Sequence, residues 1–328
     1  IAREAGLGAD LAVVTGAELQ AAADSGADAM DRLTRDAVVY ARVQPLQKLG
    51  IVESMARNGH IVAVTGDGIN DAPALKHAHV GIAMGKKGAD IARESADIIL
   101  TDDNFASIVA GVREGRVAYA NIRKVIFMSV STGAAEVLLF VLTVPFGLPI
   151  PLLAVQLLWL NLVTNGIQDV ALATEKAEGD ELAQPPHRPD LALLDGRMIR
   201  RIVLSALFMA AAGVGVLVWG RQADLPMADI RNAILLQLVI FENVLTLSAR
   251  SERGTLFGRR FFANPLLLGS VVLAQALHVG AMYTPWLRDT LQLQPVTPHV
   301  WLLLLVPAAL LLAALELDKF LTRRGWIA

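Results

Sequence analysis

The stretch HIVAVTGDGINDAPALKHAHVGIAMG, residues 60–85, places two apolar runs on either side of a polar turn. The runs His60–Gly66 and Val80–Met84 read as buried β-strands, and DAPALKHA between them reads as a short helix. The flanking sequence continues the alternation, with strands expected at Ala37–Val43 and Ala96–Leu100 and a helix from Pro45 to Gly59. Strands that alternate with helices predict a parallel sheet covered on both faces.

The polar turn VTGDGIND, residues 64–71, follows the strand at the end where parallel sheets bind their ligands. Asp67 and Asp71 offer the hard oxygen ligands that Mg²⁺ takes together with phosphate oxygens and water. Asn70 can donate to a phosphate oxygen, and Lys48, just after the preceding strand, can neutralise a phosphoryl group. The alternative is a plain acidic turn in which Asp71 caps a helix.

The composition indicates one water-facing part followed by one membrane part. The chain has 328 residues, of which 54% are hydrophobic and 18% charged, whereas soluble domains have about 25% charged residues. Residues 1–124 hold most of the acids, and residues 125–320 form a series of apolar blocks. The lack of cysteine excludes disulfides and thiolate sites, and the net charge of −2 gives no sign of a nucleic-acid partner.

A helix is expected to start near Asn104 and to run on into apolar sequence. A bilayer-spanning helix needs about 20 apolar residues. Six spans are predicted, at about 125–144, 151–173, 199–220, 230–249, 265–285 and 300–319. The loops on the outer side then hold Arg221, Arg231 and Arg288, while the other loop cations lie on the side of the first part. By the positive-inside rule, both termini of this segment are expected to be cytosolic.

Polar side chains inside the predicted spans indicate an ion site. An intramembrane charge costs about 2.5–3.5 kcal/mol or more, so it normally faces a bundle interior. On the first span Glu136 shares a helix face with two hydroxyl residues, on the second span several polar residues share a face, and on the fourth Glu242 lies at the centre. The polar residues of the second span are Asn161, Thr164, Asn165, Gln168 and Asp169. Gly166 is expected to allow local unwinding there. An all-oxygen cage of this kind suits a hard cation; the alternative is hydrogen bonding between helices.

Five motifs in order give this chain a resemblance to a known family: ARVQPLQK (41–48), TGDGINDAPALKHAHVGIAMG (65–85), ADIILTDDNFASIV (96–109), EGRVAYANIRK (114–124) and QLLWLNLVTNG (156–166). They resemble the second half of a P-type ATPase, closest to the type II, calcium-pump-like enzymes. The resemblance implies an α/β haloacid-dehalogenase-like (Rossmann-like) phosphorylation-domain fragment at residues 1–112. A stalk at 113–124 and an all-α six-helix transmembrane bundle at 125–328 are expected to follow.

The resemblance also implies roles for the residues of the turn. Asp67 matches the Mg²⁺ ligand, Asn70 and Asp71 match residues that hold the phosphoryl site together, and Lys48 matches the lysine beside the phosphoaspartate. The nucleophilic aspartate of the family lies in a DKTGT motif that this sequence does not contain. The nucleophile and the domains that bind most of the ATP are therefore expected in an N-terminal half of the same protein.

Four residues match the cation-binding positions of calcium pumps, namely Glu136, Asn161, Thr164 and Glu242. Two positions depart: Gly133 stands where those pumps have asparagine, and Asn165 stands where they have aspartate. We hypothesise that Asp169 compensates for the missing charge.

Ca²⁺ is accordingly the leading cation, with Na⁺, K⁺, H⁺ and Mn²⁺ left open. The expected location is the plasma (bacterial inner) membrane, with the lipid bilayer, ATP and the cation as partners. Two alternatives are a membrane-anchored haloacid-dehalogenase-like phosphatase, in which the two glutamates are dispensable, and a non-catalytic truncated or regulatory membrane fragment.

Overall fold

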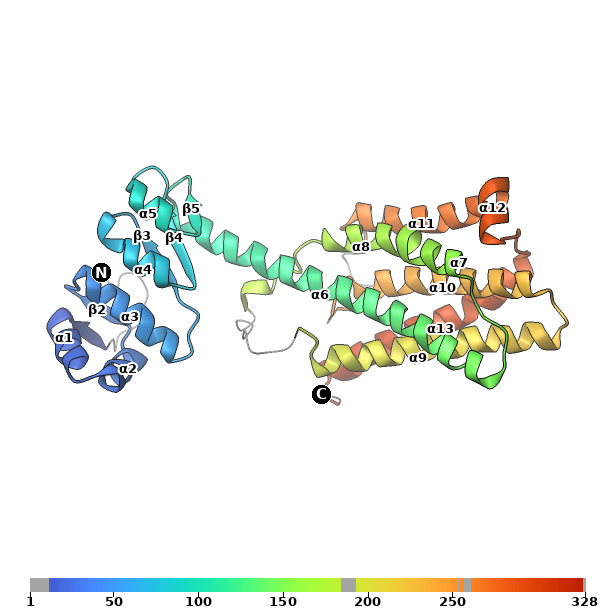
Figure 1. Ribbon diagram of the computed structural model, residues 1–328, viewed down its shortest axis with the longest axis horizontal. Helices are drawn as coiled ribbons and strands as arrows, with labels where there is room; N and C mark the ends of the chain where they lie inside the picture. Colours follow the sequence, from blue (N-terminus) through green and yellow to red (C-terminus); the bar gives the residue numbers. More distant parts are fainter. Residues whose placement is uncertain (1–11, 184–192, 253, 257–260, 327–328) are drawn as a thin grey trace. The chain divides into compact units, whose positions relative to one another are not determined.

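The computed structural model describes residues 12–183, 193–252, 254–256 and 261–326. The chain divides into two compact units, Ile1–Val112 and Arg113–Ala328. Figure 1 draws the first unit from blue to teal and the second from green to red. All strands in the described part of the chain belong to the first unit, and the second unit is helical.

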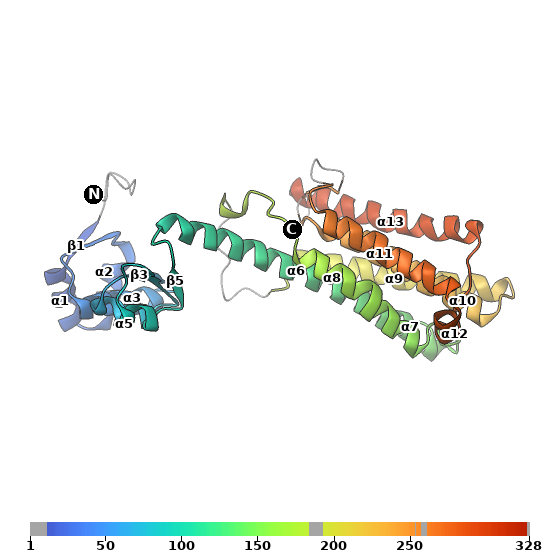
Figure 2. The same cartoon turned by 90° about the horizontal axis from the view of Figure 1, so that it is seen from above.

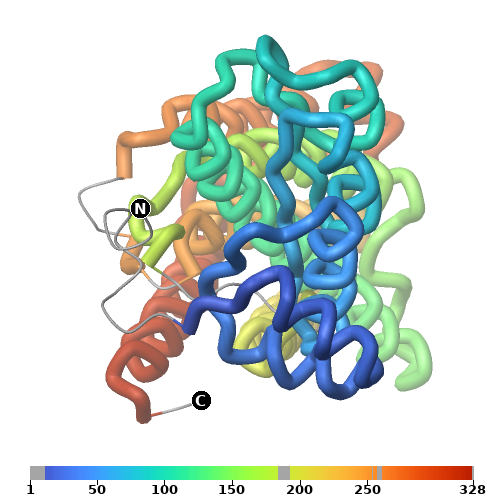
Figure 3. Tube along the Cα trace, turned by 90° about the vertical axis from the view of Figure 1, so that its left-hand side faces the viewer, coloured from blue at the N-terminus to red at the C-terminus, as the bar shows by residue number. Residues whose placement is uncertain are grey.

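The first unit alternates short strands with helices, which can be followed from blue to teal in Figure 3. Its elements are β1 (Val13–Thr15), α1 (Gly16–Asp24), α2 (Ala27–Asp36), β2 (Val39–Ala41), α3 (Pro45–Arg57), β3 (Ala63–Gly66), the 3₁₀ turn η1 (Ile69–Asp71), α4 (Ala72–His77), β4 (Val80–Met84), α5 (Asp90–Ser95) and β5 (Ile98–Leu100).

The strands form two small parallel sheets. β1 pairs with β2, and β3, β4 and β5 form a second sheet in that order. The four predicted strands and the helix from Pro45 are present, but the expectation of one sheet is wrong. Neighbouring residues of α3 explain the division, because Ile51 packs in a cluster with Leu19 and Met30 while Val52 packs in another with Val62. Each sheet therefore covers its own small core.

The turn after β3 is tight because two of its residues nearly touch. A Cβ atom added to Gly66 would lie 2.5 Å from the Cβ of Asp71. Only glycine lets the end of β3 approach the turn η1 so closely. Pro73 in the first turn of α4 then starts the following helix, where its missing N–H costs nothing.

The second unit consists of helices, and the first of them, α6, begins in the first unit. Its elements are α6 (Phe105–Val141), the 3₁₀ turn η2 (Val144–Phe146), α7 (Ala154–Trp159), the π-helix η3 (Leu160–Asn165), α8 (Gly166–Ala173), the 3₁₀ turn η4 (Glu181–Ala183), α9 (Gly196–Gln222), α10 (Met227–Ala249), α11 (Pro265–Tyr283), α12 (Pro285–Leu291) and α13 (Pro298–Arg323).

Five helices of the described residues are long and apolar enough to cross a membrane, namely α6, α9, α10, α11 and α13. The predicted helix start near Asn104 is confirmed by α6, which begins at Phe105. The second predicted span, 151–173, is divided into α7, η3 and α8, which follow one another without a gap and lie in line in Figures 1 and 2. The count of six spans is therefore not confirmed, and a crossing by this segment remains a prediction.

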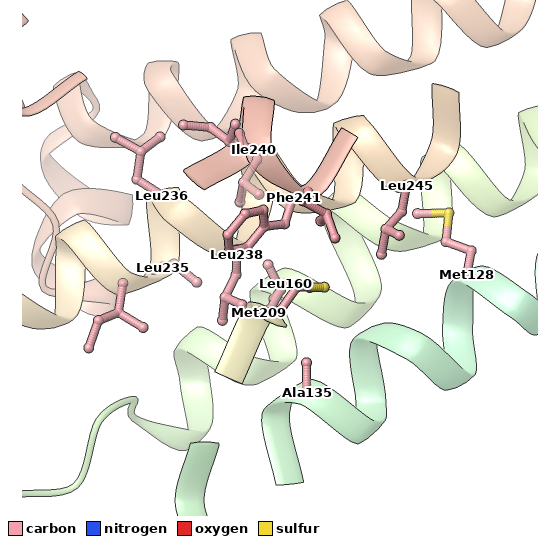
Figure 4. Close-up of a cluster of buried hydrophobic side chains, with 14 of the residues drawn as sticks. Met128, Ala135, Leu160, Met209, Leu235, Leu236, Leu238, Ile240, Phe241 and Leu245 are labelled. Carbon is pink, nitrogen blue, oxygen red and sulfur yellow. The ribbon is translucent and has the colours of Figure 1, made fainter. Parts of the chain in front are cut away.

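α10 is the central helix of the second unit. It packs against α9, α11 and α13, and 83% of its apolar 18-residue stretch is buried. Figure 4 shows Leu245 of α10 beside Met128 of α6, and Leu238 and Phe241 of α10 near Met209 of α9. Every residue of α10 from Asn232 to Glu242 is buried, so all sides of this stretch face other parts of the protein.

Candidate functional site

Lys48 and Asp71 meet at the carboxyl end of β3. Lys48 Nζ donates to Asp71 Oδ1 at 2.5 Å, and the Gly68 N–H donates to Asp71 Oδ2 at 3.3 Å. Burial raises the pKa of Asp71, but the hydrogen bonds from Lys48 and Gly68 outweigh it, so the pKa lies below its usual value. Asp71 is thus an ionised carboxylate of fixed orientation, and it holds a lysine whose side chain is 47% exposed.

Asp67 and Asn70 lie exposed on the same turn. The Ala89 N–H donates to the Asp67 carbonyl at 2.8 Å, which fixes the backbone, while neither side chain is hydrogen bonded to another described residue. No group of three or more His, Asp or Glu that could hold a metal ion occurs within the described ranges. A Mg²⁺ ion that is also bound by phosphate oxygens needs only one or two carboxylates. The free Asp67 carboxylate fits that role.

In the second unit, Asn161, Thr164 and Asn165 all lie in the π-helix η3. A π-helix is rare and frequently occurs at functional sites. The local unwinding expected at Gly166 is not found, because its φ of −58° and ψ of −38° are helical. A widened turn, and not a broken one, sets the directions of these three side chains.

Asn161 joins η3 to α6. Its Nδ2 donates to both carboxylate oxygens of Glu136, each at 2.9 Å, and to the Leu157 carbonyl at 3.1 Å. Glu136 is half-buried. Its charge is met by a neutral amide and by no cationic side chain in the described part of the chain, so it is not part of a structural ion pair.

Thr164 joins η3 to α10. Its hydroxyl donates to Glu242 Oε2 at 2.6 Å, while the other carboxylate oxygen, Oε1, is buried and has no hydrogen-bond partner among the described residues. Glu242 itself is 0% exposed. The next residue of η3 contacts α6: Asn165 Nδ2 donates to Thr132 Oγ1 at 3.1 Å, and Asn165 Oδ1 has no partner within the described ranges either.

Asp169 completes this set of oxygens. Ser129 Oγ donates to its Oδ2 at 3.1 Å, and its Oδ1 is buried without a hydrogen-bond partner in the described structure. Leaving a buried polar group unpaired costs about 1–3 kcal/mol, so Glu242, Asn165 and Asp169 each need an explanation. Oxygen atoms of carboxylates and amides are the ligands of hard cations, so each of these three unpaired oxygens can serve as a cation ligand.

The structure brings the predicted residues together in pairs and not in one cluster. Glu136, Glu242 and Asp169 each contact a different neighbour, and they do not form a group of three carboxylates among the described residues. All three involve the segment from α7 to α8. In this segment Asn161 is hydrogen bonded to Glu136, Thr164 is hydrogen bonded to Glu242, and Asp169 lies in α8.

Sequence reasoning missed a second polar network beside Glu242. Thr246 Oγ1 donates to Gln168 Oε1 at 2.6 Å, Gln168 Nε2 to Asn243 Oδ1 at 2.6 Å, and Asn243 Nδ2 to Gln275 Oε1 at 2.9 Å. Every amide oxygen in this chain of bonds accepts a hydrogen bond, so the network connects α8, α10 and α11 and offers no unpaired oxygen ligand. The sequence feature that indicates this network is Asn243, a second polar residue directly after Glu242 in an apolar span.

Comparison with known proteins gives matches to two families. Residues 149–321 match the family described as "Cation transporting ATPase, C-terminus", and residues 2–79 match "haloacid dehalogenase-like hydrolase".

Individual relatives cover nearly the whole chain. The cation-transporting ATPase pma1 of Synechocystis is 38% identical over 307 residues, which are 92% of this chain and 33% of that protein. The calcium-transporting ATPase of Bacillus subtilis is 34% identical over 88% of this chain and 33% of its own length. The sodium/potassium-transporting ATPase subunit alpha-B of Artemia franciscana is 32% identical over 97% of this chain and 36% of its length. The chain therefore spans about a third of the length of these relatives.

Proposed function

Because the chain belongs to the cation-transporting P-type ATPases, we propose that it forms the C-terminal part of an ATP-driven cation pump. In this pump, Mg²⁺-dependent formation and hydrolysis of an aspartyl phosphate drive cation transport across a membrane. The aspartate nucleophile and most of the ATP site come from an N-terminal half of the same protein. This assignment rests on the family and on the buried oxygens of Glu242, Asn165 and Asp169 that have no hydrogen-bond partner among the described residues.

In the phosphoryl half of the proposal, the turn after β3 positions the reacting groups. Asp67 binds Mg²⁺, which neutralises charge on the transferred phosphoryl group. Lys48, held in place by Asp71, supplies a positive charge beside the phosphoaspartate, and Asn70 donates to a phosphate oxygen. The short Lys48–Asp71 hydrogen bond supports this arrangement because it fixes the direction of an otherwise flexible side chain.

In the transport half of the proposal, the cation is bound between α6, η3, α8 and α10. The ligands are the oxygens of Glu136, Asn161, Thr164, Asn165, Asp169 and Glu242. The observation that carries this assignment is the set of three buried, unpaired oxygens on Glu242, Asn165 and Asp169. Ca²⁺ is the proposed cation, because two glutamates and several neutral oxygens suit it.

α6 is the proposed link between the two halves. β5 ends at Leu100, α6 starts at Phe105, and the same uninterrupted helix carries Glu136. At 1.5 Å per residue, its 37 residues extend about 55 Å. A change at the phosphoryl site can therefore reach a cation ligand along a single helix.

The test uses the full-length protein and measures phosphoenzyme formed from ATP as a function of cation concentration. Glu242→Gln keeps the shape of the side chain and removes its charge. We expect the apparent affinity for Ca²⁺ to fall at least about tenfold, because even the loss of a residue that only orients a metal ligand has an effect of that size. Glu114→Gln, the same change at an exposed position of α6, is the matched control and should leave it unchanged.

Two outcomes would overturn the pump, and a third would change only the cation. Phosphorylation that no cation stimulates would remove the pump. Full activity of both Glu242→Gln and Glu136→Gln would favour a membrane-anchored phosphatase, and stimulation by Na⁺ or Mn²⁺ in place of Ca²⁺ would keep the pump and correct the cation.

A further inference from the structure

A cavity of about 160 Å³ lies at one end of the second unit, where its lining residue Ser248 is six residues along α10 from Glu242. Four helices line it: α6, the start of α9, the end of α10 and the end of α13. Figure 1 shows the last part of α13 beside the first turn of α9, two helices that also contact each other. The volume is about that of five water molecules at 30 Å³ each, which is enough for a phosphate group with its five heavy atoms.

The lining of this cavity is rich in cations. Two acids contribute, Asp195 and Glu252, against six Lys and Arg side chains. The six cations are Arg123, Lys124, Arg197, Arg201, Lys319 and Arg323.

The buried cations of the lining are already paired. Arg123 lies 2.9 Å from Asp195 and 3.0 Å from Glu252, so it uses both acids of the cavity. Lys319 donates to Glu316 at 2.8 Å and to the Ser248 carbonyl at 2.7 Å. These contacts build the walls and fix their geometry.

Two cations at the mouth remain without such a partner. Arg197 and Arg323 are exposed, and neither has an ion pair or a side-chain hydrogen bond with any residue that the structure describes. The guanidinium group offers a planar fork of donors that matches phosphate oxygens in a bidentate way. The inner wall is apolar, with Phe127, Met198 and Leu315 all buried.

The position of the two arginines relates the cavity to the lipid headgroups. α9 and α13 are candidate membrane spans, and Arg197 is the second residue of one while Arg323 is the last of the other. Residues at the ends of spans lie at headgroup depth, where basic pockets between helices bind anionic lipids.

We propose that this cavity is a binding site for the phosphate group of an anionic phospholipid, held at its mouth by Arg197 and Arg323. The bound lipid would join α9 to α13 and would contact α6 through Arg123 and Lys124. The site shares no residue with the proposed cation ligands or with the phosphoryl turn.

The test measures binding of phosphatidylglycerol to the full-length protein by native mass spectrometry, with the unfolding midpoint in phosphatidylcholine nanodiscs, with and without phosphatidylglycerol, as a second readout. A basic residue near the surface contributes about 1 kcal/mol to binding an anionic lipid, so Arg197→Gln and Arg323→Gln should each weaken binding about fivefold. The double variant should lose the lipid-dependent rise in the midpoint. Arg221→Gln, at the other end of α9 and outside the cavity, is the matched control and should bind as the wild type does.

A parallel titration with inorganic phosphate identifies the source of the phosphate group. If phosphate alone raises the midpoint and the effect depends on Arg197 and Arg323, the site holds but a soluble anion fills it. Binding of phosphatidylglycerol that is unchanged in the double variant would overturn the proposal. So would an equal loss in Arg221→Gln, because it would mean a diffuse attraction to the membrane surface. Both positions are exposed, so the variants are expected to fold.

Discussion

At the turn after β3, the ion pair between Lys48 and Asp71 orients the Lys48 side chain but contributes little to the stability of the fold. Lys48 is 47% exposed, and ion pairs screened by solvent contribute little to folding. Its orientation, however, is set by a 2.5 Å hydrogen bond, and the Asp71 carboxylate is itself set by the Gly68 N–H. The turn therefore presents a fixed positive charge beside the exposed Asp67.

The close approach at Gly66 leads to a first prediction. Gly66→Ala places a Cβ atom 2.5 Å from that of Asp71, so it should destabilise the first unit by about 1–3 kcal/mol, the usual cost of overpacking. Gly68→Ala meets Asp71 only at 3.7 Å and should be close to neutral. Pulse proteolysis in urea on the full-length protein would measure both, and equal stability of the two variants would contradict the described turn.

The lowered pKa of Asp71 leads to a second prediction. A carboxyl whose pKa is lower in the folded state adds stability above its unfolded value, about 3.9, and this stability is lost as the pH falls through the folded value. Lys48→Met should therefore cost about 0.5 kcal/mol at neutral pH, after allowance for solvent screening. The difference from wild type should shrink below about pH 4.

The measurement is the urea midpoint of wild type and variant across that pH range, again by proteolysis of the full-length protein. Lys76→Met, which removes an exposed cation from α4, serves as the control for a general charge effect. A Lys48→Met difference that stays constant from neutral to acid pH would show that the pair does not lower the Asp71 pKa.

Among the elements, sequence patterns predicted those with clear periodicity and missed those without it. β4 at Val80–Met84 and α3 from Pro45 follow directly from an apolar run and a helix-starting proline. α1 and α2 were not predicted, and neither was η3, because one extra residue in a helical turn leaves no mark in an apolar pattern. The pairing of strands also escaped, since it depends on which face of α3 each sheet covers.

The candidate site shows the same limit. Glu136, Thr164 and Glu242 stood out as polar residues in apolar spans, but which of them would meet was set by η3, and the structure pairs them separately.

The packing of α9 on α10 gives a third prediction. A Cβ atom on Gly220 would lie 2.6 Å from Cγ1 of Ile230, which is 1% exposed, so Gly220→Ala should destabilise by about 1–3 kcal/mol. Gly215 lies on the same helix with no atom within 4 Å, and Gly215→Ala should be neutral or stabilising by up to about 1 kcal/mol, the gain in helix propensity. Thermal unfolding followed by tryptophan fluorescence distinguishes them, and the reverse order would rule out this contact.

For the whole molecule, the number of membrane crossings decides on which sides the two ends of the membrane part lie. Five single helices qualify as spans among the described residues, while α7, η3 and α8 together form the sixth predicted crossing. An odd number of crossings places the two ends of the membrane part on opposite sides of the membrane. An even number places them on the same side. The positive-inside pattern favours the even count and cytosolic ends.

The fourth prediction uses the lack of cysteine in this chain. In a full-length protein without other reactive cysteines, Phe146→Cys should react with a membrane-impermeant maleimide from the outer side, and Lys176→Cys should react only after the inner side is exposed. Both residues are exposed, and they flank α7, η3 and α8. Labelling of both from one side would mean that this segment does not cross.

The burial of α10 has a consequence for how the protein is made. Lipid reaches little of this helix in the folded unit, and Glu242 near its middle is fully enclosed. During synthesis, however, α10 leaves the ribosome before α11 and α13 exist, while a charged residue at the centre of a span opposes release from the translocon by about 2.5–3.5 kcal/mol. Its partners at that moment are α9, joined to it by the short loop 223–226, and Thr164, which has already been made. Of the five candidate spans in the described residues, the one that lipid touches least is thus a helix whose entry into the membrane depends on the order of translation.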